Sequence, residues 1–102
     1  MNFNGGDRKR LLLTATFNVD PADFTLTLLI DQSEQPCEWL GAATKAGDKW
    51  TRQARTLARF YGPQATSQPG DVALTKGLHL TRMRSSNGDT TVTAPTDPIY
   101  VP

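Results

Sequence analysis

Side chains with the chemistry of catalysis or metal binding are few in this sequence. It contains one histidine, His79, and one cysteine, Cys37, whereas a structural zinc site needs about four ligands. No serine lies in a Gly-x-Ser-x-Gly turn, so a serine nucleophile would have only His79 as its base. A histidine held by neighbouring groups is more common than a catalytic one, and we expect that role for His79. We therefore predict that the protein is not an enzyme and has no catalytic residue.

Three aspartates are the remaining candidates for metal ligands. Asp20, Asp23 and Asp31 flank expected strands and could approach one another as oxygen ligands of Ca²⁺. Their spacing is not that of a calcium-binding loop, so we interpret them as turn formers. Gly5-Gly6 and Gly62-Pro63 likewise lack the spacing of a phosphate-binding loop. The sequence thus predicts no metal, no cofactor and no small-molecule substrate.

The composition is that of one modest domain. A chain of 102 residues can bury a single core, and 11 Lys and Arg against 10 Asp and Glu give no field that selects a nucleic acid or a membrane surface. One cysteine excludes an internal disulfide, and we expect the Cys37 thiol to be buried and inert. Neither a long apolar run nor a secretory signal is visible, which predicts synthesis in the cytoplasm without a signal peptide.

The clearest sequence signal for secondary structure lies in the C-terminal third of the chain. Asn87-Gly88 separates two alternating runs, which predicts a hairpin whose two central residues have positive φ. The predicted opposite pairs are Arg84–Thr91, Met83–Val92 and Thr81–Ala94. One face would carry His79, Thr81, Met83, Val92 and Ala94, and the other Arg82, Arg84, Thr91 and Thr93.

Earlier segments are predicted to form short strands separated by turns. Alternating apolar residues mark strands over 9–17 and 24–31, and a shorter strand over 36–40 follows a polar reversal at 31–35. Residues 41–48 are small and polar, so we expect a connection there.

The segment 50–61 fits two periods. Helical spacing aligns several apolar residues, whereas a period of two places the list Trp50, Arg52, Ala54, Thr56, Ala58 and Phe60 on one face. Flanking strands and the Thr and aromatic content favour a strand, although Arg52 is a poor member of a buried face.

The succession of short strands, about ten residues apart, resembles an all-β fold of the immunoglobulin-like class, an antiparallel β-sandwich of six or seven strands without a disulfide. Trp39 lies where such folds place a core tryptophan. Leu74-x-x-Gly77-x-His79-x-Thr81 resembles the corner that opens their penultimate strand, with His79 in place of the usual tyrosine. We expect the imidazole to replace the bond that the tyrosine hydroxyl makes to the backbone.

The domain is predicted to span residues 9–94. A flexible N-terminal arm over 1–8 and an extended C-terminal arm or edge strand over 95–102 would flank it. Removal of 96–102 is expected to leave the domain folded. Alternatively, residues 99–101 could add as a strand to another subunit.

Partner binding is expected on the outer face of the hairpin and on the tail. The candidate partner-binding residues are Arg82, Arg84, Thr91, Thr93, Ile99, Tyr100 and Val101. Two basic features, Arg8-Lys9-Arg10 and the group of Arg52, Arg55 and Arg59, are interpreted as charge that protects an exposed edge.

Features along the whole chain carry a further resemblance. They are a Thr-rich opening strand, Asp20-Pro21-Ala22-Asp23-Phe24-Thr25-Leu26, Glu38-Trp39, Trp50-Thr51 through Arg59-Phe60, Gly62-Pro63, Leu74-x-x-Gly77-x-His79 and Gly88-Asp89-Thr90. Together they are similar to small immunoglobulin-like virion proteins of tailed bacteriophages, especially those of actinobacterial hosts. The resemblance implies a structural subunit of the particle, as capsid decoration or minor capsid, head–tail connection or tail accessory protein. It would bind other virion proteins, and itself as a homo-oligomer, but no nucleic acid and no membrane.

Two other functions stay open. An adhesion or carbohydrate-binding module would expose Trp50, Tyr61 or Tyr100 together as a stacking platform. A small inhibitor of a host protein would use its loops and would be a monomer with one tight partner.

Overall fold

The computed structural model describes residues 1–102 and contains strands but no helix. The strands are β1 Arg8–Lys9, β2 Leu12–Phe17, β3 Thr25–Ile30, β4 Ser33–Ala46, β5 Lys49–Thr56, β6 Phe60–Tyr61, β7 Val72–Ala73, β8 Gly77–His79, β9 Thr81–Ser86, β10 Thr91–Pro95 and β11 Ile99–Val101. All pairs are antiparallel except β6 with β7. The all-β prediction is confirmed. The strand count exceeds the predicted one because several strands have only two or three residues.

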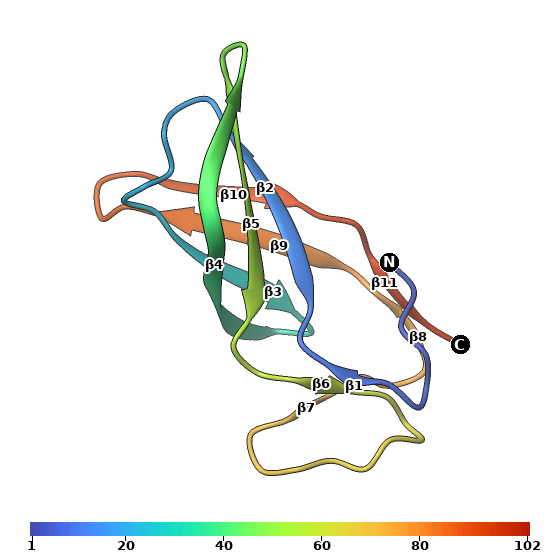
Figure 1. The fold of residues 1–102 in the computed structure, drawn as a ribbon. Helices are drawn as coiled ribbons and strands as arrows, with labels where there is room; N and C mark the ends of the chain where they lie inside the picture. Colours follow the sequence, from blue (N-terminus) through green and yellow to red (C-terminus); the bar gives the residue numbers. More distant parts are fainter.

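The largest sheet has six strands in the order β10-β9-β3-β4-β5-β2, and β4 folds it into two layers. The first part of β4 pairs with β3 as far as Pro36, and the rest pairs with β5 from Cys37 onward. Proline has no N–H to donate to a ladder, so Pro36 is a natural place for β4 to change partner. In Figure 1 the strands β2, β4 and β5 cross in front of β3, β9 and β10.

Residues 41–48 do not form the predicted connection. β4 continues to Ala46, and its register with β5 shifts between Leu40 and Thr44, which marks a bulge. Gly41 has a φ of 71° there, a conformation that glycine adopts without strain. The bulge interrupts the alternation of polar and apolar residues, and for that reason the strand was not visible in the sequence.

The segment 50–61 contains strands and no helix, but it forms two strands rather than the predicted one, because β5 ends at Thr56 and the chain bends at Leu57 and Ala58 before β6. Trp50, Arg52, Ala54 and Thr56 share the inner face of β5, and Ala54 and Thr56 are buried. Arg52 fits this face because its guanidinium lies over the ring of Trp39, 4.9 Å from the centroid, while its Nε donates to the Gly41 carbonyl.

One core fills the space between the layers and continues below them. Its eleven buried members are Phe3, Leu11, Leu13, Leu26, Leu28, Ile30, Ala54, Phe60, Leu74, Ile99 and Val101. Cys37 and Trp39 pack against it, as the sequence predicts for inward residues of the third strand. The Trp39 ring N–H donates to the Phe24 carbonyl at 2.7 Å, which connects the two layers across the interior.

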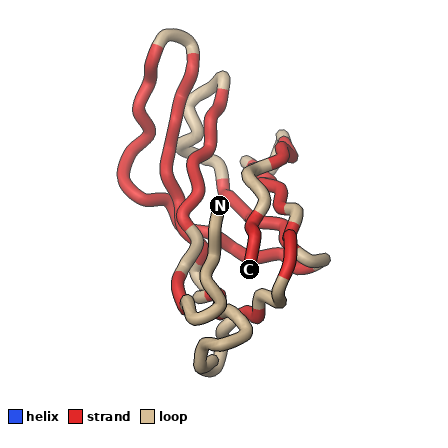
Figure 2. Tube along the Cα trace, turned by 90° about the vertical axis from the view of Figure 1, so that its right-hand side faces the viewer, coloured by secondary structure: helices blue, strands red, loops and turns tan.

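The chain ends close the lower half rather than extending as arms. The Met1 amine donates to the Pro98 carbonyl, Phe3 N–H donates to Tyr100, and both termini lie side by side in Figures 1 and 2. The side chain of Phe3 is fully buried, and so is that of Val101. The predicted boundaries at residues 9 and 94 therefore exclude residues that belong to the core.

Glycine allows the N-terminal segment to lie against the chain after β6. A Cβ on Gly62 would stand 2.3 Å from the Gly5 carbonyl oxygen, and Gly62 N–H donates to the Asp7 carbonyl. Close backbone approach is thus the structural use of a glycine whose spacing fits no phosphate-binding loop.

The C-terminal hairpin forms, but its predicted register is wrong by two residues. Arg84 pairs with Thr93 instead of Thr91, because the loop holds four residues from Asn87 to Thr90. The Asn87 carboxamide oxygen accepts from the N–H groups of Asp89 and Thr90 and closes this longer loop. A shift of two leaves every side chain on its predicted face.

The tight two-residue turn lies instead between β3 and β4. Ile30 pairs with Ser33, and the central residues Asp31 and Gln32 have φ values of 50° and 64°. Both are non-glycine residues in the left-handed region, which costs about 1 kcal/mol each. Neighbouring contacts must hold this turn.

The burial of Ile99 and Val101 predicts that β11 contributes to the free energy of unfolding. Ile99→Ala should lower the free energy of unfolding by about 2–5 kcal/mol, because it leaves a cavity where the side chain is 2% exposed. Tyr100→Ala is the matched control, since that side chain is 50% exposed and should contribute less than about 1 kcal/mol. Urea unfolding followed by circular dichroism measures both. Equal effects of the two substitutions would contradict the packing of β11.

Removal of residues 96–102 takes Ile99 and Val101 out of the core, so it should unfold the protein rather than leave it intact.

Candidate protein-binding site

The predicted binding residues of the hairpin lie on one outer face. We define the outer face as the solvent side of β10, β9, β3 and the first part of β4, with the side chains of Thr25, Thr27, Leu29, Glu34, Arg82, Arg84, Thr91, Thr93 and Pro95. Thr93 is the Cα partner of Arg84, which in turn is the partner of Thr27 on β3. The four residues Arg82, Arg84, Thr91 and Thr93 are therefore brought together, as the sequence predicts.

Charges of both signs lie on the outer face. Arg84 Nη1 is 2.7 Å from Glu34 Oε1, across the intervening strand β3, and this bond lowers the pKa of the Glu34 carboxyl. Arg82 makes no ion pair. A surface hollow of about 460 Å³ lies beside Arg82 and Glu34. It is lined by Leu29, Ile30, Asp31, Gln32, Ser33, Glu34, Leu80, Arg82 and Arg84.

Exposed apolar side chains extend the outer face toward β8 and β11. Leu80 is 76% exposed and Leu78 is 63% exposed, and Leu78 is the Cα partner of Tyr100. Sequence reasoning missed Leu29, Leu80 and Glu34 as members of this surface. The alternation from Leu78 to Arg84 could have identified Leu80, whereas Leu29 and Glu34 depend on strand pairing that no local pattern reveals.

The predicted tail residues divide between the surface and the core. Tyr100 faces solvent, but Ile99 and Val101 are buried. The backbone of all three is already paired with β8. Ile99 and Val101 are therefore corrected from binding candidates to core residues, because alternate side chains of a strand point to opposite sides.

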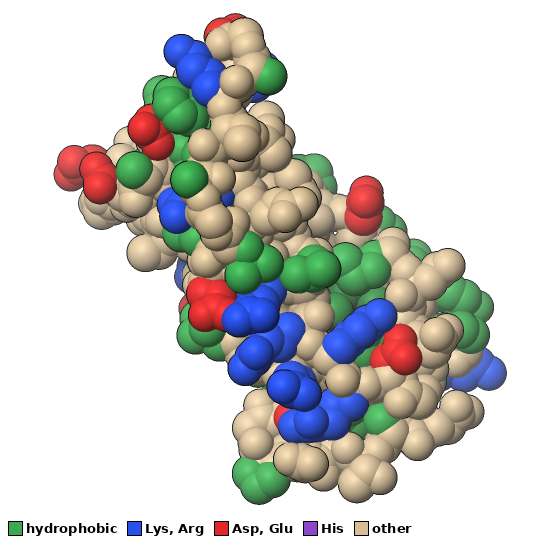
Figure 3. Space-filling model, in the orientation of Figure 1, with side chains coloured by type: hydrophobic (Ala, Val, Ile, Leu, Met, Phe, Trp, Pro, Cys, Tyr) green, Lys and Arg blue, Asp and Glu red, His purple; other side chains and the backbone are tan.

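The two basic features meet on the other side of the molecule. Arg10 Nε donates to the Leu57 carbonyl, which joins Arg8-Lys9-Arg10 to the segment between Arg55 and Arg59. Figure 3 shows the Lys and Arg side chains gathered over the lower half of the front face. Three of them have carboxylate partners, in the pairs Arg8–Asp71, Lys9–Asp7 and Arg55–Glu38. Arg52 is not part of this group, since it covers Trp39.

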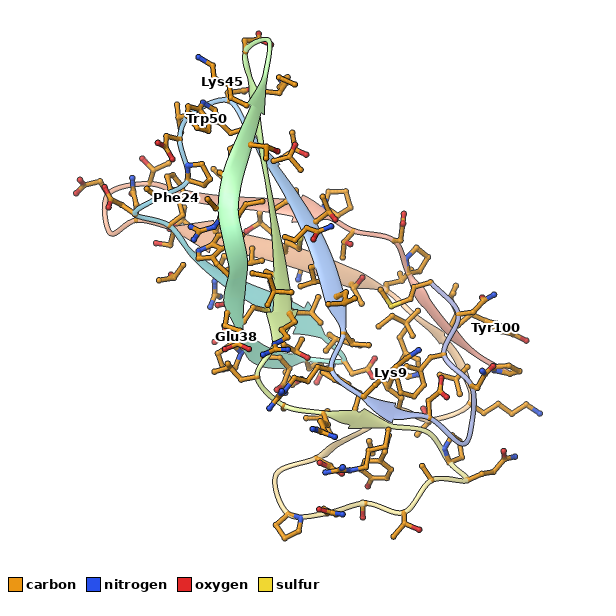
Figure 4. The ribbon with its side chains drawn as sticks, viewed as in Figure 1. Lys9, Phe24, Glu38, Lys45, Trp50 and Tyr100 are labelled. Atoms are coloured by element: carbon orange, nitrogen blue, oxygen red, sulfur yellow. The ribbon has the colours of Figure 1, made fainter.

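The aromatic residues of the carbohydrate-binding alternative do not form one platform. Trp50 lies on the β4–β5 hairpin, where Lys45 covers its ring at 5.5 Å from the centroid. Tyr61 is in β6 and partly buried, and Tyr100 is in β11. Figure 4 places Trp50 and Tyr100 at opposite ends of the molecule, so they cannot stack on one ligand.

His79 is almost fully buried, and both of its ring nitrogens have partners. Nε2 lies 2.8 Å from the Thr75 carbonyl oxygen and Nδ1 lies 2.7 Å from Asp31 Oδ2. The predicted bond from the imidazole to the backbone is thus confirmed. The Thr75 carbonyl oxygen only accepts, so Nε2 donates to it. Burial lowers the pKa of His79, but the bonds to Thr75 and Asp31 outweigh it and the pKa is raised.

The Cys37 thiol and the carboxylates of Asp20 and Asp31 each have a hydrogen-bond partner within the fold. Cys37 is half-buried, and burial raises the pKa of its thiol to about 11. No three His, Cys, Asp or Glu side chains lie close enough together to hold a metal ion, and Asp20 instead caps its own turn through Ala22 N–H. Asp31 is the partner of His79.

Comparison with protein-family models, with curated proteins and with solved structures found no match for this chain. The structure has no helix of a length and apolarity that would cross a membrane.

The His79–Asp31 pair predicts a pH dependence of stability. The folded protein holds the His79 proton more tightly than the unfolded chain does. Its contribution is therefore fully present below about pH 6.5 and is lost as the pH rises through the raised pKa of the folded state. The urea midpoint should fall over this range, and should fall less in Asp31→Asn. Equal slopes in the two proteins would assign the pH dependence to other groups.

The raised pKa of Cys37 predicts that its thiol is modified slowly. At pH 8 a thiol with a pKa of about 11 is only about one-thousandth thiolate, the form that reacts. Ellman's reagent should therefore react on the order of a hundredfold more slowly with the native protein than with the protein in 8 M urea, by roughly the ratio of thiolate populations. Reaction at similar rates in the two states would show that the thiol is open to solvent.

Proposed function

We propose that this chain is a non-enzymatic structural subunit of a tailed-phage particle, which acts by packing against other virion proteins and against copies of itself. Capsid decoration or minor capsid, head–tail connection and tail accessory roles all fit this class. The proposal rests on the whole-chain resemblance to small virion proteins. The observation that supports it most directly is the outer face, where hydroxyl, arginine and leucine side chains lie exposed over neighbouring strands.

We also propose that the fold is a variant of the immunoglobulin-like class. Leu74 and His79 are buried at the corner before β9, and His79 bonds to the Thr75 carbonyl as the tyrosine of such corners bonds to the backbone. Trp39 faces the core from the third long strand. The departure is at β4: sandwiches of this class place their second and third strands in different sheets, whereas here β3 and β4 also pair directly.

The proposed function predicts that the protein is a stoichiometric component of purified particles. Particles banded in a density gradient should contain the chain at a constant ratio to the major capsid protein, as measured by quantitative mass spectrometry. Detection in the lysate but not in the particles would exclude a virion subunit.

A matched pair of variants tests which surface attaches the protein. Thr93→Glu adds a charge to the outer face and should reduce the amount of protein in the particle. Thr14→Glu adds the same charge to exposed strand β2 on the other layer and should leave it unchanged. Equal occupancy of the two variants would show that the outer face is not the attachment surface.

A further inference from the structure

The outer face carries opposite charges in a single row. Arg82 on β9, Leu29 on β3 and Glu34 on β4 are successive Cα partners, so the leucine lies between a cation and a carboxylate. Neighbouring strands are about 4.8 Å apart, which places the two charges at similar distances on either side of β3. Arg82 has no ion pair within its own chain, and Glu34 is largely exposed beside Arg84.

We propose that the outer face binds the same face of a second copy, about a two-fold axis that is parallel to β3 and passes over Leu29. Rotation by 180° about this axis exchanges the two sides of β3. Arg82 of each copy then lies opposite Glu34 of the other, and the contact is made twice. A two-fold axis perpendicular to the strands would instead oppose Arg82 to Arg82 and Glu34 to Glu34, which is unfavourable.

The apolar side chains fit the same arrangement. Leu80 is 76% exposed and stands on the β9 side of the hollow of about 460 Å³, whereas Gln32 and Ser33 line its other side. The rotation places Leu80 of one copy over the Gln32–Ser33 side of the other copy's hollow. An exposed leucine thereby leaves water in both copies, which favours association.

The charge pattern of the face favours a second copy over an unrelated partner. A partner with a single sign of charge would meet repulsion from either Arg82 or Glu34. A patch that carries both signs on opposite sides of an apolar centre is complementary to itself.

This pairing specifies one contact of the proposed function, the packing against copies of itself, and rests on that proposal only in its biological role. It is a property of the isolated chain in solution, so it can be tested without any particle. A monomeric protein would overturn the pairing and leave the particle role to be judged by particle composition alone.

Sedimentation equilibrium tests the pairing with a matched pair of variants. The wild-type protein should sediment as a dimer at about 100 µM, and Leu80→Glu should raise the dimer dissociation constant at least about tenfold. Leu12→Glu is the control, because Leu12 is 64% exposed on the solvent side of β2 in the other layer. A monomeric wild-type protein, or dissociation by Leu12→Glu and not by Leu80→Glu, would overturn the proposal.

A charge exchange tests the axis itself. Arg82→Glu alone and Glu34→Arg alone each oppose like charges in a homodimer and should be monomeric. Mixed together they should form a heterodimer, because both contacts are then Glu against Arg. Circular dichroism confirms the fold of each variant, and Glu34→Gln, which should raise the dissociation constant, replaces Glu34→Arg if the latter unfolds. A mixture that stays monomeric, or a Glu34→Gln variant that dimerises as the wild type does, would overturn the axis.

Discussion

Continuity of β4 through both layers is the constraint on which the rest of the structure depends. The backbone N–H and C=O groups of this strand are divided between β3 and β5, so neither layer can slide past the other without breaking a ladder of hydrogen bonds. Pro36 marks where the division occurs, and the bond from Trp39 to the Phe24 carbonyl fixes the separation across the interior. The space that the core side chains fill is therefore set by one strand.

The buried corner and the outer face are also connected through one turn. Asp31 and Gln32 have unfavourable φ values, and the bond from His79 to the Asp31 carboxylate holds the turn from the interior side. The same two residues line the hollow of the outer face. The buried histidine thus helps to determine the shape of the hollow on the outer face.

Sequence patterns predicted the features that depend on nearest neighbours along the chain. The alternation over 24–31 identified β3. The alternation on either side of Asn87-Gly88 placed Arg82 and Arg84 on one face even though the hairpin register was wrong, because a shift of two residues preserves the face. Features that depend on distant pairing were not predictable. The bulge at Gly41 breaks the period of two, Ile99 and Val101 are too few to reveal a buried strand, and Leu29 joins the outer face only through β9.

The pairing of residues 1–3 with residues 98–100 makes closure of the core depend on contacts between distant parts of the sequence. Phe3 N–H donates to the Tyr100 carbonyl, so two segments that lie far apart in the sequence must meet before the lower half is closed. Contacts so distant in sequence slow folding, because the loop that they close is nearly the whole chain. Until β11 pairs with β8, the core cluster lacks the side chains of Ile99 and Val101. Before that pairing, the chain exposes the apolar surface against which Ile99 and Val101 pack, and the docking of β11 removes it from water.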